Sequence, residues 1–435
     1  MGTVKLLPAI VKRAKDAAQS VKRSLGQVIT YVKEKTLTHM LDLLHFEVHG
    51  YAIEPNAEQD ILHLYCQLTV EAAVCPLCQS ISLDAQDEQE RCVRDLDWSG
   101  KRTFIHFAIR RFDCPGCGHR FTEELQAVAW RRHQTVRFEA AVYERCLESS
   151  KSAVAKACHL SYSTVEGIFK RYARKQARRS HLGTVRILGM DEIAVKKRHQ
   201  QYALVLSDLE RRCVLAVLTS REQSELQKWF NTLTQEQHAT ISMVSMDMWR
   251  PYRSFIERTL PQARIVADRF HVMKQLNQQL SKTRRQIQRT ADEPTKSALK
   301  GCRWLLVRNR SELSSQEQTQ LQQLLRADAQ LRTAYLFKEE FRLIFEKLHD
   351  REQARRFLNA WMLKVRSSHN KYLLDFVNTL THWFEQILNY FDKRITNGFV
   401  EGINRAIRFI IARACGFRNF DNFRLQVLAQ HGSPD

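Results

Sequence analysis

Four of the eleven cysteines form two tight pairs, a spacing that is typical of a zinc site. Cys75 and Cys78 belong to the run CPLC. Cys114 and Cys117 belong to the run CPGCGH. A gap of two residues lets both thiolates of a pair reach one ion, and four sulfur ligands in a tetrahedral array suit Zn²⁺. Because four ligands leave no open position for a reacting group, we predict a structural zinc ion. The alternative is four unrelated free thiols.

Two aspartates each end an apolar run that is typical of a buried strand. The segment TVRILGMD ends at Asp191, and the segment ISMVSMD ends at Asp247. From residue 184 the patterns predict three strands, then helix, strand, helix, strand and helix, which is the order of a ribonuclease-H-like α/β sheet. The first and fourth strands of such a sheet lie side by side. We therefore expect the two carboxylates to meet at one edge, where they could share divalent metal ions about 3.5–4 Å apart.

A third ligand must come from elsewhere, and the segment NGFVEGINRAIRFIIARACGFRNF offers one. It predicts an amphipathic helix in which Glu401, Arg405 and Arg408 occupy positions i, i+4 and i+7 on one face. A carboxylate beside two guanidiniums suits metal binding next to a phosphate. The structural alternative is that Glu401 simply pairs with Arg405.

The two aspartates also have structural alternatives. Asp191 could cap a strand end or pair with a lysine, and Asp247 could be the N-cap of the helix that begins near Pro251. Three other acidic residues are rival ligands. They are Glu192, Asp208 and Asp268.

The rival ligands differ in their positions. Glu192 alternates onto the face of its strand opposite to Asp191, because successive side chains of a strand point to opposite faces. Asp268 ends the segment ARIVAD, which we expect to be a central strand, and this makes Asp268 the strongest rival.

A helix-turn-helix is predicted within the segment SKSAVAKACHLSYSTVEGIFKRYARKQ, the last part of three helices over residues 136–178. Val165, Ile168 and Phe169 would face inward, and Ser161 or Ser163 could cap the second helix of the motif. Residues 151–186 hold nine lysines and arginines and one acidic residue, so we expect this motif to bind DNA. The alternative is an ordinary helical hairpin. The candidate DNA contacts are Tyr162, Thr164, Lys170, Arg171 and Arg174.

The net charge of +21 bears on the partners of the protein, not on its fold. Such a charge favours polyanions, and nucleic acid first among them. The sequence contains no run of about 18 apolar residues, so we predict no membrane span. It also lacks the pattern of a secretory signal peptide, which predicts a cytoplasmic protein.

The motifs together resemble bacterial insertion-sequence transposases of the ISL-three family. The matching pieces are CPLC with CPGCGHRFTE, MDEIAVKKRHQQY, VSMDMWRPY, ADRFHVMKQLN and TNGFVEGINRAIRFIIARACGFRNFDNFR, in the order of the family over roughly residues 40–428. The resemblance implies a DDE transposase with a zinc finger, a helix-turn-helix and an all-helical insertion before the glutamate. By motif position it places the catalytic triad on Asp191, Asp247 and Glu401.

The resemblance also implies an activity and its partners. The enzyme would bind the terminal inverted repeats, cleave phosphodiester bonds at the element ends and transfer the 3′-OH ends to target DNA, with Mg²⁺ or Mn²⁺ at the triad. Arg405, Arg408 and Arg413 are candidates to hold backbone phosphates. We expect at least a homodimer on double-stranded DNA, because two ends must be paired, and a nucleoid-associated protein of the bacterial cytoplasm. The alternative is a catalytically inactive DNA-binding regulator of the same fold.

These expectations define a multi-domain α+β chain with a β-rich zinc module, a helix-turn-helix and a ribonuclease-H-like core that is split by an all-α insertion. A basic amphipathic helix precedes them. The predicted parts are the extension 1–36, the zinc-binding domain 37–135, the helix-turn-helix domain 136–180, the first part of the core 181–280, the helical insertion 281–392 and the last core helix with its glutamate 393–435.

Overall fold

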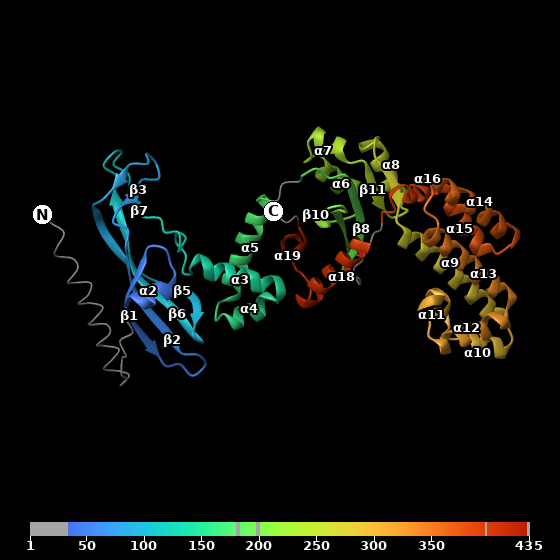
Figure 1. Ribbon diagram of the computed structural model, residues 1–435, viewed down its shortest axis with the longest axis horizontal. Helices are drawn as coiled ribbons and strands as arrows, with labels where there is room; N and C mark the ends of the chain where they lie inside the picture. Colours follow the sequence, from blue (N-terminus) through green and yellow to red (C-terminus); the bar gives the residue numbers. More distant parts are fainter. Residues whose placement is uncertain (1–33, 180–182, 197–200, 396–397, 433–435) are drawn as a thin grey trace. The chain divides into compact units, whose positions relative to one another are not determined.

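The computed structural model describes residues 34–179, 183–196, 201–395 and 398–432 (Figure 1). The chain divides into two compact units, residues 1–172 and 173–435. Most of the predicted basic helix 1–36 lies outside the described residues, which begin with the short helix α2 (Glu34–Leu41). None of the helices within the described ranges is long and apolar enough to cross a membrane.

The first unit is built on a five-stranded sheet in the order β1-β2-β6-β5, with β7 paired to β6. Its longest hairpin joins β5 to β6 through Ser99 and Gly100, whose φ angles of +49° and +73° suit a tight two-residue turn. This hairpin lies between the two cysteine pairs in the sequence. The strands are β1 (Phe46–Glu54), β2 (Ile61–Leu68), β5 (Ala85–Trp98), β6 (Lys101–Asp113) and β7 (Arg120–Thr122).

Three helices follow this sheet, as the sequence predicts. They are α3 (Val136–Glu148), α4 (Lys151–Ala157) and α5 (Tyr162–Arg179). Each begins at a side-chain cap, because the hydroxyls of Thr135, Ser150 and Ser161 accept hydrogen bonds from backbone N–H groups of the first turn. The inward face of α5 is as expected, since Val165, Ile168 and Phe169 are fully buried.

The second unit contains a five-stranded sheet in the order β10-β9-β8-β11-β12. The pairs β10–β9 and β9–β8 are antiparallel, whereas β8, β11 and β12 run parallel. The first and fourth strands in sequence are therefore neighbours, as the sequence analysis predicts. The strands are β8 (Ile187–Lys196), β9 (Gln201–Asp208), β10 (Cys213–Leu218), β11 (Met243–Met246) and β12 (Arg264–Ala267).

Helices cover both faces of this sheet. On one face, Ile193 and Val205 pack against Ile403, Ile407 and other apolar residues of α18 (Gly398–Arg413) and α19 (Phe420–His431). On the other face, the apolar side chains pack against α6 (Gln223–Phe230), α8 (Arg250–Thr259) and α9 (Arg269–Thr290). A short helix, α7 (Gln235–Thr240), precedes β11. Asp191 alternates in phase with Ile193, so its side chain belongs to the α18 face.

The region between α9 and α18 is helical throughout its described residues, as its Gln-, Leu- and Arg-rich pattern predicts. Its apolar side chains form one continuous core with the α9 face of the sheet. The helices are α10 (Glu293–Leu299), α11 (Arg303–Val307), the 3-10 helix η2 (Arg310–Glu312), α12 (Ser315–Ala327), α13 (Ala329–Lys347), α14 (Arg351–Ser367), α15 (Lys371–His382), α16 (Phe384–Leu388) and α17 (Tyr390–Lys393).

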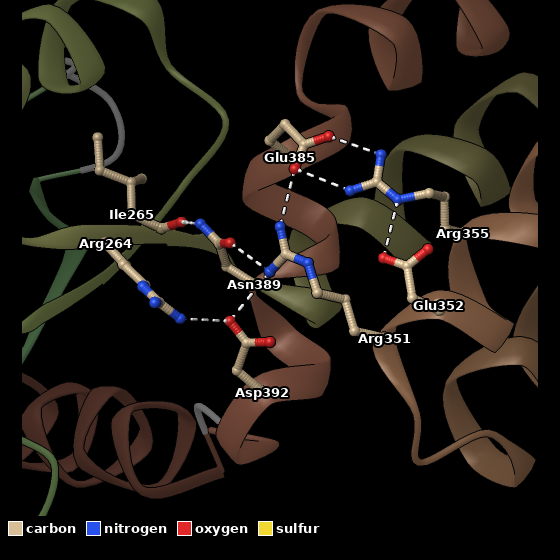
Figure 2. Close-up of polar contacts among 8 residues, drawn as sticks. All are labelled: Arg264, Ile265, Arg351, Glu352, Arg355, Glu385, Asn389 and Asp392. Carbon is tan, nitrogen blue, oxygen red and sulfur yellow. Dashed lines mark hydrogen bonds and ion pairs between the residues drawn. The ribbon is translucent and has the colours of Figure 1, made fainter.

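Residues of the helical region bind the edge strand β12 through hydrogen bonds and ion pairs (Figure 2). Asn389 Nδ2 donates a hydrogen bond of 2.7 Å to the backbone carbonyl of Ile265, and its Oδ1 accepts one of 2.7 Å from Arg351. Asp392 pairs with both Arg351 and Arg264, at 2.9 and 3.0 Å. These contacts occupy an edge strand that would otherwise present unpaired backbone groups.

Candidate active site and zinc site

Asp191, Asp247 and Asp268 lie in a row across neighbouring parallel strands. Asp247 and Asp268 directly follow β11 and β12, whereas Asp191 lies within β8. The expectation that this strand ends at Asp191 was wrong, because β9 continues to pair with it as far as Lys196. The register between β11 and β8, continued by two residues, places Asp247 opposite Asp191. The register between β12 and β11, continued by one residue, places Asp268 opposite Asp247. The sheet therefore brings together acidic residues that are far apart in the sequence.

Asp191 and Asp247 are close enough to share a cation. One oxygen of each carboxylate and one ring nitrogen of His271 all lie within 4.8 Å of one another. Burial, followed by the nearby charge of Asp247, raises the pKa of Asp191 to about 6. Two half-buried carboxylates repel each other when both are ionised, so a cation between them is favoured. Carboxylate oxygens are ligands that suit Mg²⁺ and Mn²⁺.

His271, in the first turn of α9, supplies positive charge to this site. Its Nδ1 lies 2.8 Å from Asp268 Oδ2 and also contacts a carboxylate oxygen of Asp247. Burial disfavours the charged imidazole, but hydrogen bonds and charge interactions with the two aspartates outweigh burial and raise the pKa of His271 to about 10. The carboxylates hold this protonated imidazole as they would hold another cation, so the carboxylates fit a divalent metal ion.

The helix that carries Glu401 contacts the site through a different residue. Asn404 of α18 is buried, and its Nδ2 donates a hydrogen bond to Asp191 Oδ2. Glu401 lies one helical turn earlier, about 4.5 Å along the helix axis. It is exposed, and among the described residues the group that could hold a metal ion is completed by His271, not by Glu401. The structure thus brings α18 to Asp191 and leaves Glu401 outside the immediate cluster.

The rival acidic residues have other partners. Glu192 points to the opposite face, as expected, where its Oε1 accepts a hydrogen bond of 3.0 Å from the hydroxyl of Tyr252. Asp208 is buried and accepts hydrogen bonds from the backbone N–H groups of Glu210 and Arg211. Neither residue belongs to the cluster at Asp191.

Asp268 differs from its expected place. Its strand, β12, is the edge strand of the sheet and not a central one, so that expectation was wrong. Central position cannot be read from an apolar run of four residues, because the helical region buries this edge as fully as a neighbouring strand would. Asp268 is the N-cap of α9, where it accepts a hydrogen bond from the Phe270 N–H, and it holds His271.

The four predicted zinc ligands come together in the first unit. Their Sγ atoms lie within 4.8 Å of one another, with 3.3 Å between Cys78 and Cys114 and 3.8 Å between Cys75 and Cys117. Tetrahedral Zn²⁺ with bonds of about 2.3 Å separates its sulfur ligands by about 3.8 Å, so the cluster fits this ion.

Two similar backbone turns position these thiolates. The N–H of Gln79 donates to the carbonyl of Cys75, and the N–H of Gly118 donates to the carbonyl of Cys114. Gln79 and Gly118 both have positive φ angles, of +63° and +70°. The short strands β3 (Ala73–Val74) and β4 (Ile81–Ser82) flank the first turn. Each pair of ligands is thus made by one local turn, which is why its spacing alone reveals it.

Of the predicted DNA contacts on α5, two are exposed and three interact with other residues of the protein. Tyr162 is half exposed and Arg174 is exposed. Lys170 pairs with Glu166 of the same helix at 3.3 Å, and Arg171 pairs with the buried Glu139 of α3. Thr164 shares a hydrogen bond of 2.8 Å with Ser161, the residue that caps the helix. On α18, Arg405 and Arg408 are exposed and Arg413 is half-buried.

Two residues at the aspartate cluster are absent from the expected ligand set. His271 carries a sequence signal, because it follows Asp268 by three residues within the DRFHV run. Asn404 follows Glu401 by three residues and therefore shares its side of the helix. Neither spacing identifies a contact with an aspartate until the strands are placed.

Comparison with known proteins identifies the parts of the chain. A family model described as transposase matches residues 188–427. A model for the helix-turn-helix domain of transposase family ISL3 matches residues 118–173. A model for the zinc-finger of transposase IS204/IS1001/IS1096/IS1165 matches residues 71–117 and supports structural zinc at the four cysteines.

Individual relatives agree with these models. The transposase for insertion sequence element IS1001 of Bordetella parapertussis is 30% identical over 388 residues, which cover 87% of this chain and 95% of the relative. The transposase for insertion sequence element IS1557 of Mycobacterium tuberculosis is 27% identical over 353 residues, or 75% of this chain and 78% of the relative. The chain therefore belongs to transposase family ISL3 (ISL-three), the family of insertion-sequence transposases whose motifs it carries.

Proposed function

We propose that this transposase binds the terminal inverted repeats of its insertion sequence, cleaves a phosphodiester bond at each end and joins the freed 3′-OH ends to target DNA. The observation that carries the proposal is the pair of carboxylates, Asp191 and Asp247, which lie opposite each other on adjacent parallel strands. A regulator that only binds DNA has no need of two repelling carboxylates held this close.

We infer a ribonuclease-H-like core from the strand order β10-β9-β8-β11-β12 with two antiparallel and two parallel pairings. Residues 281–392 would be an all-helical insertion in this core, and residues 393–435 would complete it. The other boundaries predicted from the sequence, 1–36, 37–135, 136–180 and 181–280, likewise stay proposals.

The proposed metal ligands are Asp191, Asp247 and Glu401. Bound Mg²⁺ or Mn²⁺ supplies a water of lowered pKa and stabilises charge on the leaving 3′ oxygen. The register of the sheet holds the two aspartates together, and the Asn404–Asp191 hydrogen bond holds α18 against β8. Glu401 would approach them from the first turn of α18, where it is exposed.

The remaining residues position DNA. Phosphoryl transfer asks a protein mainly for positioning and for charge. Arg405 and Arg408 are exposed on α18, and we assign them to backbone phosphates near the cut. Arg413 is the third candidate on this helix. His271 would keep Asp247 and Asp268 oriented through its contacts with both.

Recognition of the element ends is assigned to the helix-turn-helix. A helix-turn-helix in a transposase implies DNA binding, and α5 presents Tyr162 and Arg174 on its exposed side. Thr164, Lys170 and Arg171 complete the proposed surface, with the last two also engaged in ion pairs. Because transposition joins two ends, we expect a dimer or larger assembly on DNA.

The proposal is tested with purified full-length protein and a labelled duplex that carries the terminal repeat and its flanking DNA. With Mg²⁺ or Mn²⁺, we expect wild-type protein to cut at the repeat boundary. Asp191→Asn, Asp247→Asn and Glu401→Gln should bind the duplex and fail to cut it. Wild-type protein that binds and never cuts with either metal would support the inactive regulator instead. If Glu401→Gln alone still cuts, Asp268 becomes the candidate third ligand.

A further inference from the structure

A pocket of about 480 Å³ opens at the same end of the second sheet as the aspartates. β8 continues past Asp191 to Lys196, β9 begins at Gln201 and β10 ends at Leu218, so these strands all reach this end. The segment after β10 and the turn between α18 and α19 complete the walls. The residues that matter here are Tyr202, Arg221, Glu222, Phe417, Arg418 and Phe420.

The walls of this pocket combine aromatic rings with cations. Tyr202 is 39% exposed, so part of its side chain is open to a ligand. The guanidinium of Arg221 lies 5.9 Å from the centre of that ring. Two arginines, Arg221 and Arg418, face one acidic residue, Glu222, which leaves a net positive lining. Flat rings beside guanidiniums suit a ligand with a planar base and a negative phosphate.

Arg221 links the pocket to the neighbours of both proposed metal-binding aspartates. Its guanidinium lies 3.9 Å from Glu192, the residue after Asp191. It also lies 5.4 Å from the ring of Trp249, two residues after Asp247. The pocket is therefore adjacent to the segments that hold the reacting phosphate in the proposed function.

The distance along the chain fits a short stretch of DNA. Val195, in the pocket wall, lies four positions after Asp191 on β8, which is roughly 13 Å at about 3.3 Å per residue. A few nucleotides span this distance, because the rise of B-DNA is about 3.4 Å per nucleotide. The pocket volume is within the range of about 300–1,000 Å³ that is usual for small-ligand sites.

We propose that this pocket binds one unpaired nucleotide of the element end, within a few nucleotides of the bond that is cut, with its base stacked on Tyr202 and its phosphate at Arg221. This inference rests on the proposed function, and it adds a site that separates one base from the duplex near the catalytic carboxylates. Stacking on an aromatic ring tolerates any base, so the site would recognise an unpaired state and not a sequence.

The test asks whether the effect of removing one base on binding depends on the side chain of Tyr202. Full-length protein binds end duplexes in which a single abasic site is moved through the nucleotides on both sides of the cut, with Ca²⁺ in place of Mg²⁺ and binding as the readout. At one position we expect the abasic site to weaken binding to wild-type protein about fivefold to a hundredfold, the usual range for one stacked base. The same abasic site should change binding to Tyr202→Ala less than twofold.

Controls separate stacking from a loss of folding. Tyr202→Phe keeps the ring and should keep the abasic effect. Phe357→Ala removes an exposed aromatic residue of α14, outside the pocket, and should also keep it. Arg221→Ala should lower the slope of affinity against salt by about one phosphate contact, whereas Arg212→Ala, exposed in the β9–β10 turn at the other end of the sheet, should not.

The two proposals fail separately. An abasic scan with equal effects on wild-type protein and Tyr202→Ala at all positions overturns the pocket, even when wild-type protein cuts the same duplex in Mg²⁺. Protein that shows the coupling and never cuts retains the nucleotide site and loses the cleavage activity. An effect of abasic sites in target DNA alone would also contradict the assignment to the element end.

Discussion

The zinc site and the aspartate site hold their ligands in opposite ways. Each pair of zinc ligands is formed by one backbone turn, and only the meeting of two turns is a matter of tertiary structure. The aspartates come from strands that are far apart in sequence and are aligned by the register of the sheet. The zinc ligands form a closed set, whereas the aspartates repel each other and keep a cation beside them. We expect the first site to contribute to stability and the second, as a proposed metal site, to lower it.

The largest expected effect is the loss of zinc. Cys78→Ser removes one of four ligands, and we expect the first unit to lose its zinc and about 3–5 kcal/mol of stability, since structural zinc binds small zinc-finger peptides with roughly 10 kcal/mol or more. Metal analysis and thermal unfolding measure both changes. Cys92→Ser is the matched control, because Cys92 is an exposed cysteine outside the cluster. Equal zinc content in both variants would contradict the assigned ligand set.

Removing the protonated imidazole of His271 from the aspartate site should have the next largest effect on stability. His271→Ala leaves Asp247 and Asp268 without their counter-charge, and we expect a loss of about 2–3 kcal/mol, less than the roughly 3–5 kcal/mol for a fully buried pair. Because the pKa of His271 is raised to about 10 in the folded state, its contribution is complete below about pH 6.5 and is lost as the pH rises towards 10. Denaturant unfolding at pH 6 and pH 10 measures this. A variant equally destabilised at both pH values would contradict the ion-pair role.

Neutralising one aspartate should raise the stability of the second unit, in contrast to the two substitutions above. In the absence of divalent metal, we expect Asp191→Asn to stabilise the second unit by about 1–2 kcal/mol at pH 8, because one pKa unit corresponds to about 1.4 kcal/mol and the site is partly solvated. Burial and Asp247 raise the pKa of Asp191 to about 6, so the penalty of ionising it appears between about pH 4 and pH 6 and is complete above pH 6.

The pH profile and the metal response check this prediction. The stability gain of Asp191→Asn should be present at pH 8 and absent at pH 4. Mn²⁺ should raise the melting temperature of wild-type protein and have a smaller effect on the variant. A variant less stable than wild-type protein at pH 8 without metal would show that the two carboxylates do not strain the site.

The smallest effect concerns the edge strand that carries Asp268. Asn389→Ala removes the hydrogen bonds to Ile265 and Arg351 (Figure 2), and we expect a loss of about 1–2 kcal/mol, since a buried partner is left unsatisfied. Zinc content should not change. Asn378→Ala, on α15, is a comparable substitution outside this junction. Equal unfolding curves for the two variants would mean that the helical region does not stabilise β12.

Local sequence patterns predicted the features of this chain that are formed by residues close together in the sequence. The cysteine turns, the capped helix-turn-helix with Val165, Ile168 and Phe169 inside, and the long helical region all follow the sequence prediction. The strand order also followed, because the apolar runs before Asp191 and Asp247 indicate buried strands that lie side by side. The end of the first strand did not follow, because β8 continues past Asp191 to Lys196 and pairs there with β9. The central place expected for β12 was wrong, because a four-residue apolar run does not reveal whether a strand or a helix covers its edge.

The sequence by itself determined which residues form the cysteine cluster and the helix-turn-helix, because spacing within one turn or one helix sets those contacts directly. Only the tertiary structure decided that His271 lies between Asp247 and Asp268, that Asn404 contacts Asp191, and that Arg221 of the aromatic pocket lies near Glu192. These contacts depend on strand register and on the packing of α9 and α18 against the sheet. In each contact, other parts of the chain set the distance between the two residues. That distance therefore cannot be predicted from the spacing of the two residues in the sequence.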